Sequence, residues 1–412
     1  MARTLLAAFL LAAAARAAEV VETEHYRLEW EGDRAEAEEA ARLLEAAWKP
    51  FQEYFKAKPK LGKDERLKVR FFASAESWAA AITADGATPP GGAGGYYWPG
   101  SETAYLFRQP TFYYTRVLML HEAAHQFHYL AKTRNKNPVA EWYTEGVAEY
   151  LSWHHWDGAT LELGVVPAVS LKHYSAAALA EVRAEGFDLE ALVEGKVKPS
   201  RAMDWALLRY LAAGRDGKPH PKFDAFRRKM DGGVNPTPLF WKMFGRPPAF
   251  GKEFDAWLAK EQQPWVQVYN EWVPLARNRL RGFSSAVSVV RLAEPAELLK
   301  ATIEVPKERT MWLGGALLHY TDENDYSVAM LNRTGQMRVA RRQGDRWQIM
   351  EQGEGPPPGA DGNYRFDVFR KGGKVYLMFE GGLSYGPGEL PGHIMGLAIE
   401  KCDLTFRDLE WR

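Results

Sequence analysis

The sequence predicts an α+β protein in which a helix-rich first part is followed by an all-β sandwich. From about residue 117 to residue 279 apolar residues recur mostly at helical spacing. Past Gly282 the short segments YRFDVFRK, KVYLMFE and DYSVAML alternate apolar and polar residues and are separated by glycine turns. Short strands at regular spacing are typical of a jelly-roll-like sandwich. We therefore expect one domain over residues 18–280 and a sandwich domain over 283–412.

The first domain opens with strands and a long helix. EHYRLEW resembles a strand, and helical spacing follows over about 34–55. Two further segments, 66–74 (RLKVRFFAS) and 103–109 (TAYLFRQ), are rich in β-formers. The stretch between them at 85–100, DGATPPGGAGGYYWPG, is rich in glycine and proline and is expected to be loop.

Composition and charge exclude several classes of protein. A hydrophobic content of 46% with 15 tryptophans excludes a disordered chain. The 53 basic residues balance the 53 acidic ones without a long like-charge block, so neither a nucleic-acid surface nor a polybasic membrane anchor is expected. Cys402 is the only cysteine, which excludes disulfides within the chain and disfavours a cysteine-ligated metal or a Cys–His nucleophile.

The N-terminus has the layout of a secretory signal. A basic residue, Arg3, precedes an apolar run and an A-x-A sequence that ends at Ala17. The run is shorter than the ~20 residues that span a bilayer, and no cysteine follows it for lipid attachment. We expect residues 1–17 to be a signal peptide, and the mature chain to be secreted or periplasmic without a membrane span.

The segment LMLHEAAHQFHYL (118–130) is a candidate metal-binding helix. Residues four apart in a helix differ by about 40° around the axis, so His121 and His125 point the same way and can bind one zinc. Glu122 lies ~100° further round, where it can reach a metal-bound water without ligating the metal. The alternative is an ordinary amphipathic helix, because HExxH arises by chance in about one such chain in fifty.

A catalytic zinc also needs a third protein ligand, and the segment NPVAEWYTEGVAEYLSWHHW offers one. Pro138 can start a second helix there. Glu145 and Glu149 are four apart and share a face; Glu145 can complete a His₂Glu site, and Glu149 can accept the free N–H of a ligating histidine. The alternative is two solvated glutamates, but the apolar neighbours favour a buried helix: Val139, Trp142, Val147, Ala148 and Leu151.

HExxH followed by W-x-x-E-G-x-A-E-Y, here Trp142 to Tyr150, resembles the gluzincin zinc metallopeptidases and in particular their peptidase-MA-like group of exported proteins. The resemblance covers roughly residues 24–215. It implies a thermolysin-like domain that holds one Zn²⁺ per chain and hydrolyses peptide or protein substrates. The residues that it assigns are zinc ligands His121, His125 and Glu145 and the general base Glu122.

The residue that stabilises the oxyanion is left open. Gluzincins usually supply a tyrosine or histidine, and the resemblance places a tyrosine where Arg201 stands, four residues before the tryptophan of MDWALLRYL. Arg201, Tyr210, His173 and Tyr174 are the candidates. This departure keeps open a degenerate protein that binds zinc without turnover. The resemblance also implies that a preceding strand such as TAYLFRQ offers its edge to an extended peptide. An endopeptidase is the default because no acidic motif for a free amine is evident.

Three further histidines have ordinary interpretations. His128 is expected to be packed or solvated, and His154 and His155 to lie at a helix C-terminus, where histidine suits the dipole.

The second domain is similar to concanavalin-like, laminin-G-type sandwiches, which often bind glycans. Trp347, Tyr376 and Tyr385 can stack on sugar rings, although the core is the preferred place for each. Two rival functions therefore remain: a non-catalytic zinc protein whose sandwich binds a glycan or protein partner, and a carbohydrate-active protein. The second is disfavoured because no acidic pair in the sandwich stands out as a glycosidase dyad.

Overall fold

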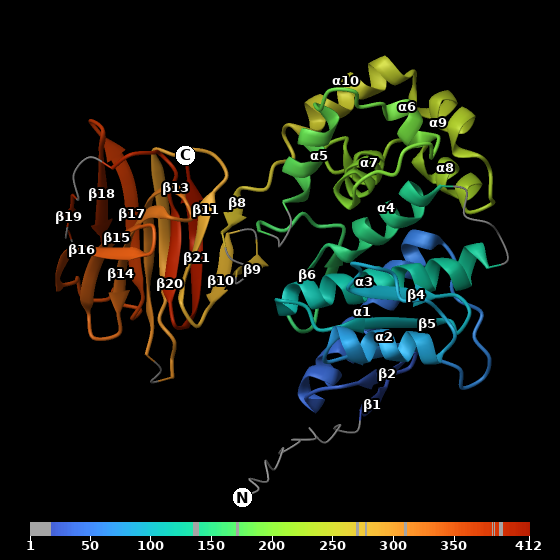
Figure 1. The fold of residues 1–412 in the computed structure, drawn as a ribbon, viewed down its shortest axis with the longest axis horizontal. Coiled ribbons are helices and arrows are strands. Elements are labelled where there is room, and N and C mark those ends of the chain that lie inside the picture. The colour runs from blue at the N-terminus through green and yellow to red at the C-terminus, as the bar shows by residue number, and fades with distance from the viewer. Residues whose placement is uncertain are drawn as a thin grey trace, which may run out of the picture.

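The computed structural model describes residues 18–134, 140–169, 173–268, 272–276, 278–308, 311–380, 382, 384–386 and 390–412. The expected signal peptide, the expected helix start at Pro138 and the side chain of Tyr385 lie outside the described residues. Within them the chain is a mixed α+β protein with a helix-rich lobe and a β-sandwich lobe (Figure 1), which confirms the fold class at that level.

The helix-rich lobe begins with a five-stranded mixed sheet in the order β1-β2-β3-β5-β4. The three central strands run parallel, and the two edge strands β1 and β4 are antiparallel to their neighbours. The strands are β1 (Glu19–Glu22), β2 (Tyr26–Trp30), β3 (Leu67–Phe72), β4 (Gly95–Trp98) and β5 (Thr103–Phe107). Strand β4 lies in the stretch 85–100 that the sequence analysis described as loop, so that prediction was wrong for its last part. Two tyrosines and a tryptophan form a strand there despite the surrounding glycines and prolines.

Helices cover both faces of this sheet. The buried side chains of α1 and α3 share one core with the strands, and α2 packs on the opposite face. The helical elements of the lobe are α1 (Arg34–Phe55), α2 (Ala75–Ala84), α3 (Phe112–His128), the π-turn η1 (Tyr129–Thr133), α4 (Glu141–Ser152), α5 (Tyr174–Val182), α6 (Leu189–Val193), α7 (Arg201–Ala213), α8 (Phe223–Met230), α9 (Pro236–Phe244) and α10 (Pro247–Leu258). A small hairpin of β6 (His154–Trp156) and β7 (Leu161–Leu163) follows α4.

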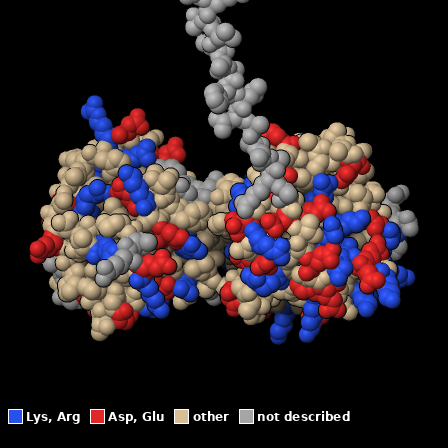
Figure 2. Space-filling model, turned by 90° about the horizontal axis from the view of Figure 1, so that it is seen from below, with Lys and Arg blue, Asp and Glu red and all other residues tan. Residues whose placement is uncertain are grey.

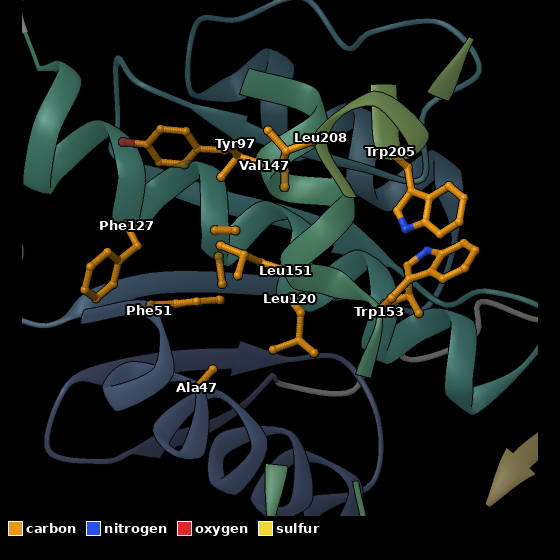
Figure 3. Packing of buried hydrophobic residues seen from close by; sticks show 14 of the residues in the cluster. Ala47, Phe51, Tyr97, Leu120, Phe127, Val147, Leu151, Trp153, Trp205 and Leu208 are labelled. Atoms are coloured by element: carbon orange, nitrogen blue, oxygen red, sulfur yellow. The ribbon is translucent and has the colours of Figure 1, made fainter. Parts of the chain in front are cut away.

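Large buried side chains fix α3, α4 and α7 against one another (Figure 3). Leu120 of α3 and Leu151 of α4 lie in the same cluster, and the indoles of Trp153 and Trp205 stack with ring centroids 4.5 Å apart. At Gly146 a Cβ atom would lie 2.6 Å from the backbone oxygen of Asp204, so only glycine allows α4 and α7 to approach this closely. These three helices carry the candidate site.

The second lobe is a sandwich of two seven-stranded antiparallel sheets, ordered β19-β18-β17-β12-β21-β10-β9 and β16-β15-β14-β13-β20-β11-β8. Their inner faces share one core, to which alternate residues such as Ala329 and Leu331 contribute. Its strands are β8 (Trp265–Gln267), β9 (Trp272–Ala276), β10 (Arg279–Phe283), β11 (Val287–Leu292), β12 (Leu298–Glu304), β13 (Leu313–Asp322), β14 (Asp325–Asn332), β15 (Gln336–Gln343), β16 (Arg346–Glu354), β17 (Tyr364–Lys371), β18 (Lys374–Phe379), β19 (Ser384–Tyr385), β20 (Gly396–Glu400) and β21 (Asp403–Trp411). The two sheets thus include β8 and β9, which precede residue 280.

The lobes are joined by packing as well as by the chain. Ala168 and Val169, which precede α5, lie in the core of the sandwich, and Val273 of β9 lies in the core of the helical lobe. The backbone N–H of Trp265 donates to the Ala168 oxygen at 3.3 Å. Buried Gln263 donates from Nε2 to the Pro167 oxygen at 2.9 Å. The segment before α5 is therefore held by the linker that enters the sandwich.

The visible surface is mixed in charge. Figure 2 shows acidic and basic side chains interspersed over the face seen from below, with more of both on the helical lobe. In the part of the chain that the structure describes, no helix has the length and apolar character needed to cross a membrane.

Candidate metal centre

Three donor atoms from two helices meet in the helical lobe. His121 and His125 project from α3 with their Nε2 atoms 3.1 Å apart, and Oε2 of Glu145 on α4 lies 3.3 Å from each. The helix that presents the histidines begins at Thr111, whose side chain caps it by accepting from the Tyr114 N–H. The structure thus brings together the three residues that the sequence analysis assigned as zinc ligands.

These spacings fit a zinc ion. Ligand bonds of 2.0–2.1 Å at the corners of a tetrahedron put neighbouring donors ~3.3 Å apart, which matches the observed 3.1 to 3.3 Å. Two imidazoles and a carboxylate are also a donor set typical of catalytic zinc. Among the described residues three protein donors converge here, which would leave a fourth position of a tetrahedral site for water or substrate.

Burial and mutual charge shape the protonation of these donors. Burial lowers the pKa of His121 to about 4, which favours the neutral imidazole that a metal requires. For His125 burial also acts to lower the pKa, but the nearby carboxylates of Glu145 and Glu122 outweigh it and the net shift is upward. Burial acts to raise the pKa of Glu145, yet the two histidines hold it well below its usual range. Glu145 is therefore an anion at the centre of the cluster.

Glu122 lies beside the donors without being one of them. A Cβ atom on Gly95 of β4 would lie 2.7 Å from its Oε1, so the edge strand passes directly over this carboxyl. Burial raises the pKa of Glu122 to about 7, and a hydrogen bond from the Tyr97 backbone acts in the opposite direction. A buried carboxyl with a pKa near neutrality can both take and give a proton.

Glu149, one turn after Glu145, lies behind His121. Its Oε1 is 3.6 Å from Nδ1 of His121, longer than a hydrogen bond. The hydroxyl of Tyr174 donates to the same Oε1 at 3.4 Å. Tyr174, an expected oxyanion candidate, therefore contacts Glu149 rather than one of the three donors, and its burial together with that carboxylate raises its pKa.

Of the oxyanion candidates, Arg201 is the one placed at the donors. Its NH1 lies 2.6 Å from Oε2 of Glu145 and 3.3 Å from Oδ2 of Asp204. Tyr210 instead points to Glu253 at 3.4 Å, and His173 Nε2 lies 3.0 Å from the Gln263 backbone oxygen. The structure does not bring these last two to the cluster.

The strand expected to offer a free edge does not have one. Strand β5, the TAYLFRQ segment, is paired on both sides, with β3 and with β4. The free edge belongs to β4, which also contacts Glu122. That expectation was wrong because β4 was hidden in a glycine-rich stretch.

Two parts of the site were not predicted from the sequence, Asp204 and strand β4. Asp204 is 2% exposed, and burial raises its pKa to about 8 despite the nearby Arg201 guanidinium. The Gly95–Trp98 strand is the other, and its only signal was the β-forming triplet YYW. For Asp204 a signal was present, since an acid between Met203 and Trp205 in the largely apolar segment MDWALLRYL indicates a buried carboxyl.

Three further histidines, His128, His154 and His155, lie outside the donor cluster. His128 is buried with Nε2 2.9 Å from Oδ1 of Asp231, so it is packed rather than solvated. His154 and His155 open β6 instead of ending α4, which corrects the expected helix-end position. His154 Nδ1 contacts the Ser152 oxygen at 2.8 Å, and within the described residues its Nε2 has no hydrogen-bond partner.

The buried imidazole of His154 predicts acid sensitivity. Burial lowers its pKa to about 3, whereas the unfolded chain binds a proton near pH 6.5. The unfolded state then binds more protons, so the free energy of unfolding should fall as the pH drops below about 6.5. His154→Asn keeps a donor for the Ser152 oxygen and removes the charge. Urea unfolding between pH 8 and pH 5 should show a shallower pH slope for the variant; equal slopes would contradict the assignment.

In the sandwich, the preference for core positions was wrong for Trp347. Its side chain is 41% exposed on the edge strand β16, with its ring centroid 5.6 Å from that of Tyr326. Tyr376 is half-buried and stacks on Phe369 at 5.3 Å.

The chain matches no protein-family model and no curated protein sequence. Among solved structures it is similar to the carbohydrate-binding module CBM66 from Bacillus subtilis, with 11% identity, 35% of this chain and 93% of that chain covered, and a TM-score of 0.31. A toad ovary galectin solved with thio-digalactose shows 15% identity over 31% of this chain and 100% of that one, with a TM-score of 0.24. A Bacillus subtilis protein of unknown function with a galectin-like fold shows 14% identity over 37% and 89%, with a TM-score of 0.26. Scores at this level do not support an assignment of function.

Proposed function

We propose that the protein is an exported zinc metallopeptidase of the gluzincin type, with a thermolysin-like helical lobe. One observation carries the proposal: His121, His125 and Glu145 place three donors at the spacing of a zinc tetrahedron while Glu122 lies beside them as a separate carboxyl. When bound, zinc would supply a Lewis acid and lower the pKa of its water to about 7.

Residues of the chain would transfer the proton, hold the peptide and support the histidine ligand. Glu122 takes a proton from the attacking water and passes it to the leaving amine, a role that suits its position under β4 and its raised pKa. The free edge of β4 lies over Glu122 and can hold an extended peptide by backbone hydrogen bonds. The hydroxyl of Tyr174 supports Glu149, which backs His121.

The alternative is a zinc-containing protein without turnover, whose sandwich binds a glycan or a protein partner. The observation in its favour is the exposed Trp347 beside Tyr326, because an exposed indole offers a flat face to a sugar ring. Hydrolysis of a peptide library by the wild-type chain would favour the first function over this one.

The first test is the metal content of the purified mature chain. We expect about one zinc per chain by elemental mass spectrometry, and loss of that zinc in His121→Ala, because two remaining donors do not hold a catalytic site. His128→Ala, which changes a buried histidine outside the cluster, should keep its zinc. A wild-type chain that takes up no zinc even after incubation with it would overturn the proposed function.

A further inference from the structure

The guanidinium of Arg201 is partly exposed to solvent and yet contacts one of the three donors of the metal centre. Arg201 is the first residue of α7, and its side chain reaches the oxygen of Glu145 that both histidines share. Asp204, in the same turn, accepts from the same nitrogen. One terminal nitrogen, NH1, thus makes both contacts.

The rest of the guanidinium is open. Its side chain is 40% exposed, and within the described residues neither Nε nor NH2 makes a hydrogen bond. The N–H groups on these two nitrogens form the planar fork that matches a carboxylate with two parallel hydrogen bonds. A single carbonyl oxygen would use this fork only in part. The open edge therefore suits a carboxylate better than an oxyanion, and NH1, the nitrogen beside the donors, is already engaged.

Several carboxylates act on this arginine: burial acts to lower its pKa, but Glu145, Asp204, Glu149 and Glu141 outweigh it and the net shift is upward. Asp204 is buried and accepts from NH1, so this side of the guanidinium already has a protein partner. Within the described residues its Oδ1 has no hydrogen-bond partner. Glu145 also contacts NH1, and its charge would be shared with a bound metal. The N-terminal end of α7 adds positive potential at the same point.

We propose that Arg201 binds the C-terminal carboxylate of the substrate, so that the centre prefers peptides whose scissile bond lies close to a free C-terminus. This inference rests on the proposed function and changes its expected form from an endopeptidase to an enzyme that acts at C-terminal ends. Asp204 is then a positioning residue that holds the guanidinium in place.

Equilibrium binding tests the inference without turnover. The full-length Glu122→Gln chain, loaded with zinc, is titrated calorimetrically with an N-acetylated tripeptide and with the same peptide as its C-terminal amide. We expect the free acid to bind roughly ten- to hundredfold more tightly, the range for hydrogen bonds to charged groups. Adding Arg201→Gln should remove that difference, because it should weaken binding of the free acid much more than binding of the amide. Arg183→Gln, which removes an exposed arginine paired with Asp255, should keep the difference.

Arg201→Lys distinguishes the inference from a folding defect. Lysine keeps the positive charge but lacks the two parallel N–H donors, so this variant should retain only part of the preference for the free acid over the amide. Equal affinities for acid and amide in the parent chain would overturn the inference. An Arg201→Gln variant that lowers the affinity for both peptides equally would also overturn it. The same holds for a variant that lowers kcat for both peptides without changing the ratio of their KM values. Either result assigns Arg201 to the oxyanion or to the support of Glu145. Failure of the wild-type chain to hydrolyse either peptide would instead count against the proposed function, whatever the binding ratio.

Discussion

Replacing Glu122 by glutamine should lower peptide hydrolysis by about 10²- to 10⁴-fold, the usual contribution of a general base. Glutamine has the same shape, and it therefore fits under Gly95 without a new contact, but its amide cannot take a proton. The side chain is not among the three converging donors, so the variant should keep its zinc. Initial rates on a peptide library and elemental zinc analysis would be measured on the same preparation.

The matched comparison is His121→Ala, which should lose zinc and hydrolysis together. A Glu122→Gln chain that retains activity within about tenfold of wild type would assign proton transfer to another group. A variant that loses its zinc would show that Glu122 helps to hold the metal.

Trp205→Ala should strongly destabilise the helical lobe. Trp205 is 1% exposed, stacks on Trp153 and also contacts Tyr174 edge-on, with ring centroids 6.2 Å apart. Truncating such a side chain costs about 3–5 kcal/mol through lost burial and the cavity left behind. Because domains are stable by only about 5–15 kcal/mol, the loss should be plain in urea unfolding followed by tryptophan fluorescence and circular dichroism.

Trp347→Ala is the control, because this indole is 41% exposed and its removal should change the free energy of unfolding by no more than about 0.5 kcal/mol. A Trp205→Ala chain as stable as this control would mean that α4 and α7 are held together by other contacts than the stacked indoles.

The sequence predicted the donors of the candidate site better than their surroundings. Helical periodicity alone places His121 and His125 on one face, and the spacing to Glu145 allows a return helix, so local rules are sufficient. Arg201 and Asp204 come from α7, 56 or more residues after Glu145, and their approach depends on how α7 packs at Gly146. No local pattern carries that information. Tyr210 lies on the same helix as Arg201 but faces α10 for the same reason.

The edges of the sheets were also hard to predict. Strand β4 has four residues within a glycine- and proline-rich stretch, too few for a period-two pattern to be seen. Strands β8 and β9 are three and five residues long and precede the alternating segments, so the start of the sandwich appeared later than it is. A long alternating strand such as β17 was recognised because one of its faces is buried over many residues.

Each lobe contributes residues to the hydrophobic core of the other, and this affects how the protein unfolds. Ala168 and Val169 leave the sandwich core only if the segment before α5 is released, and Tyr174 at the start of α5 supports Glu149 behind His121. Loss of the sandwich would therefore be felt at the metal centre, and the lobes should form one cooperative unit of unfolding rather than two. Proteolysis between the lobes should therefore not release an intact catalytic fragment. A chain that ends before β8 should expose the apolar segment at Ala168 and Val169, which the sandwich covers in the full chain.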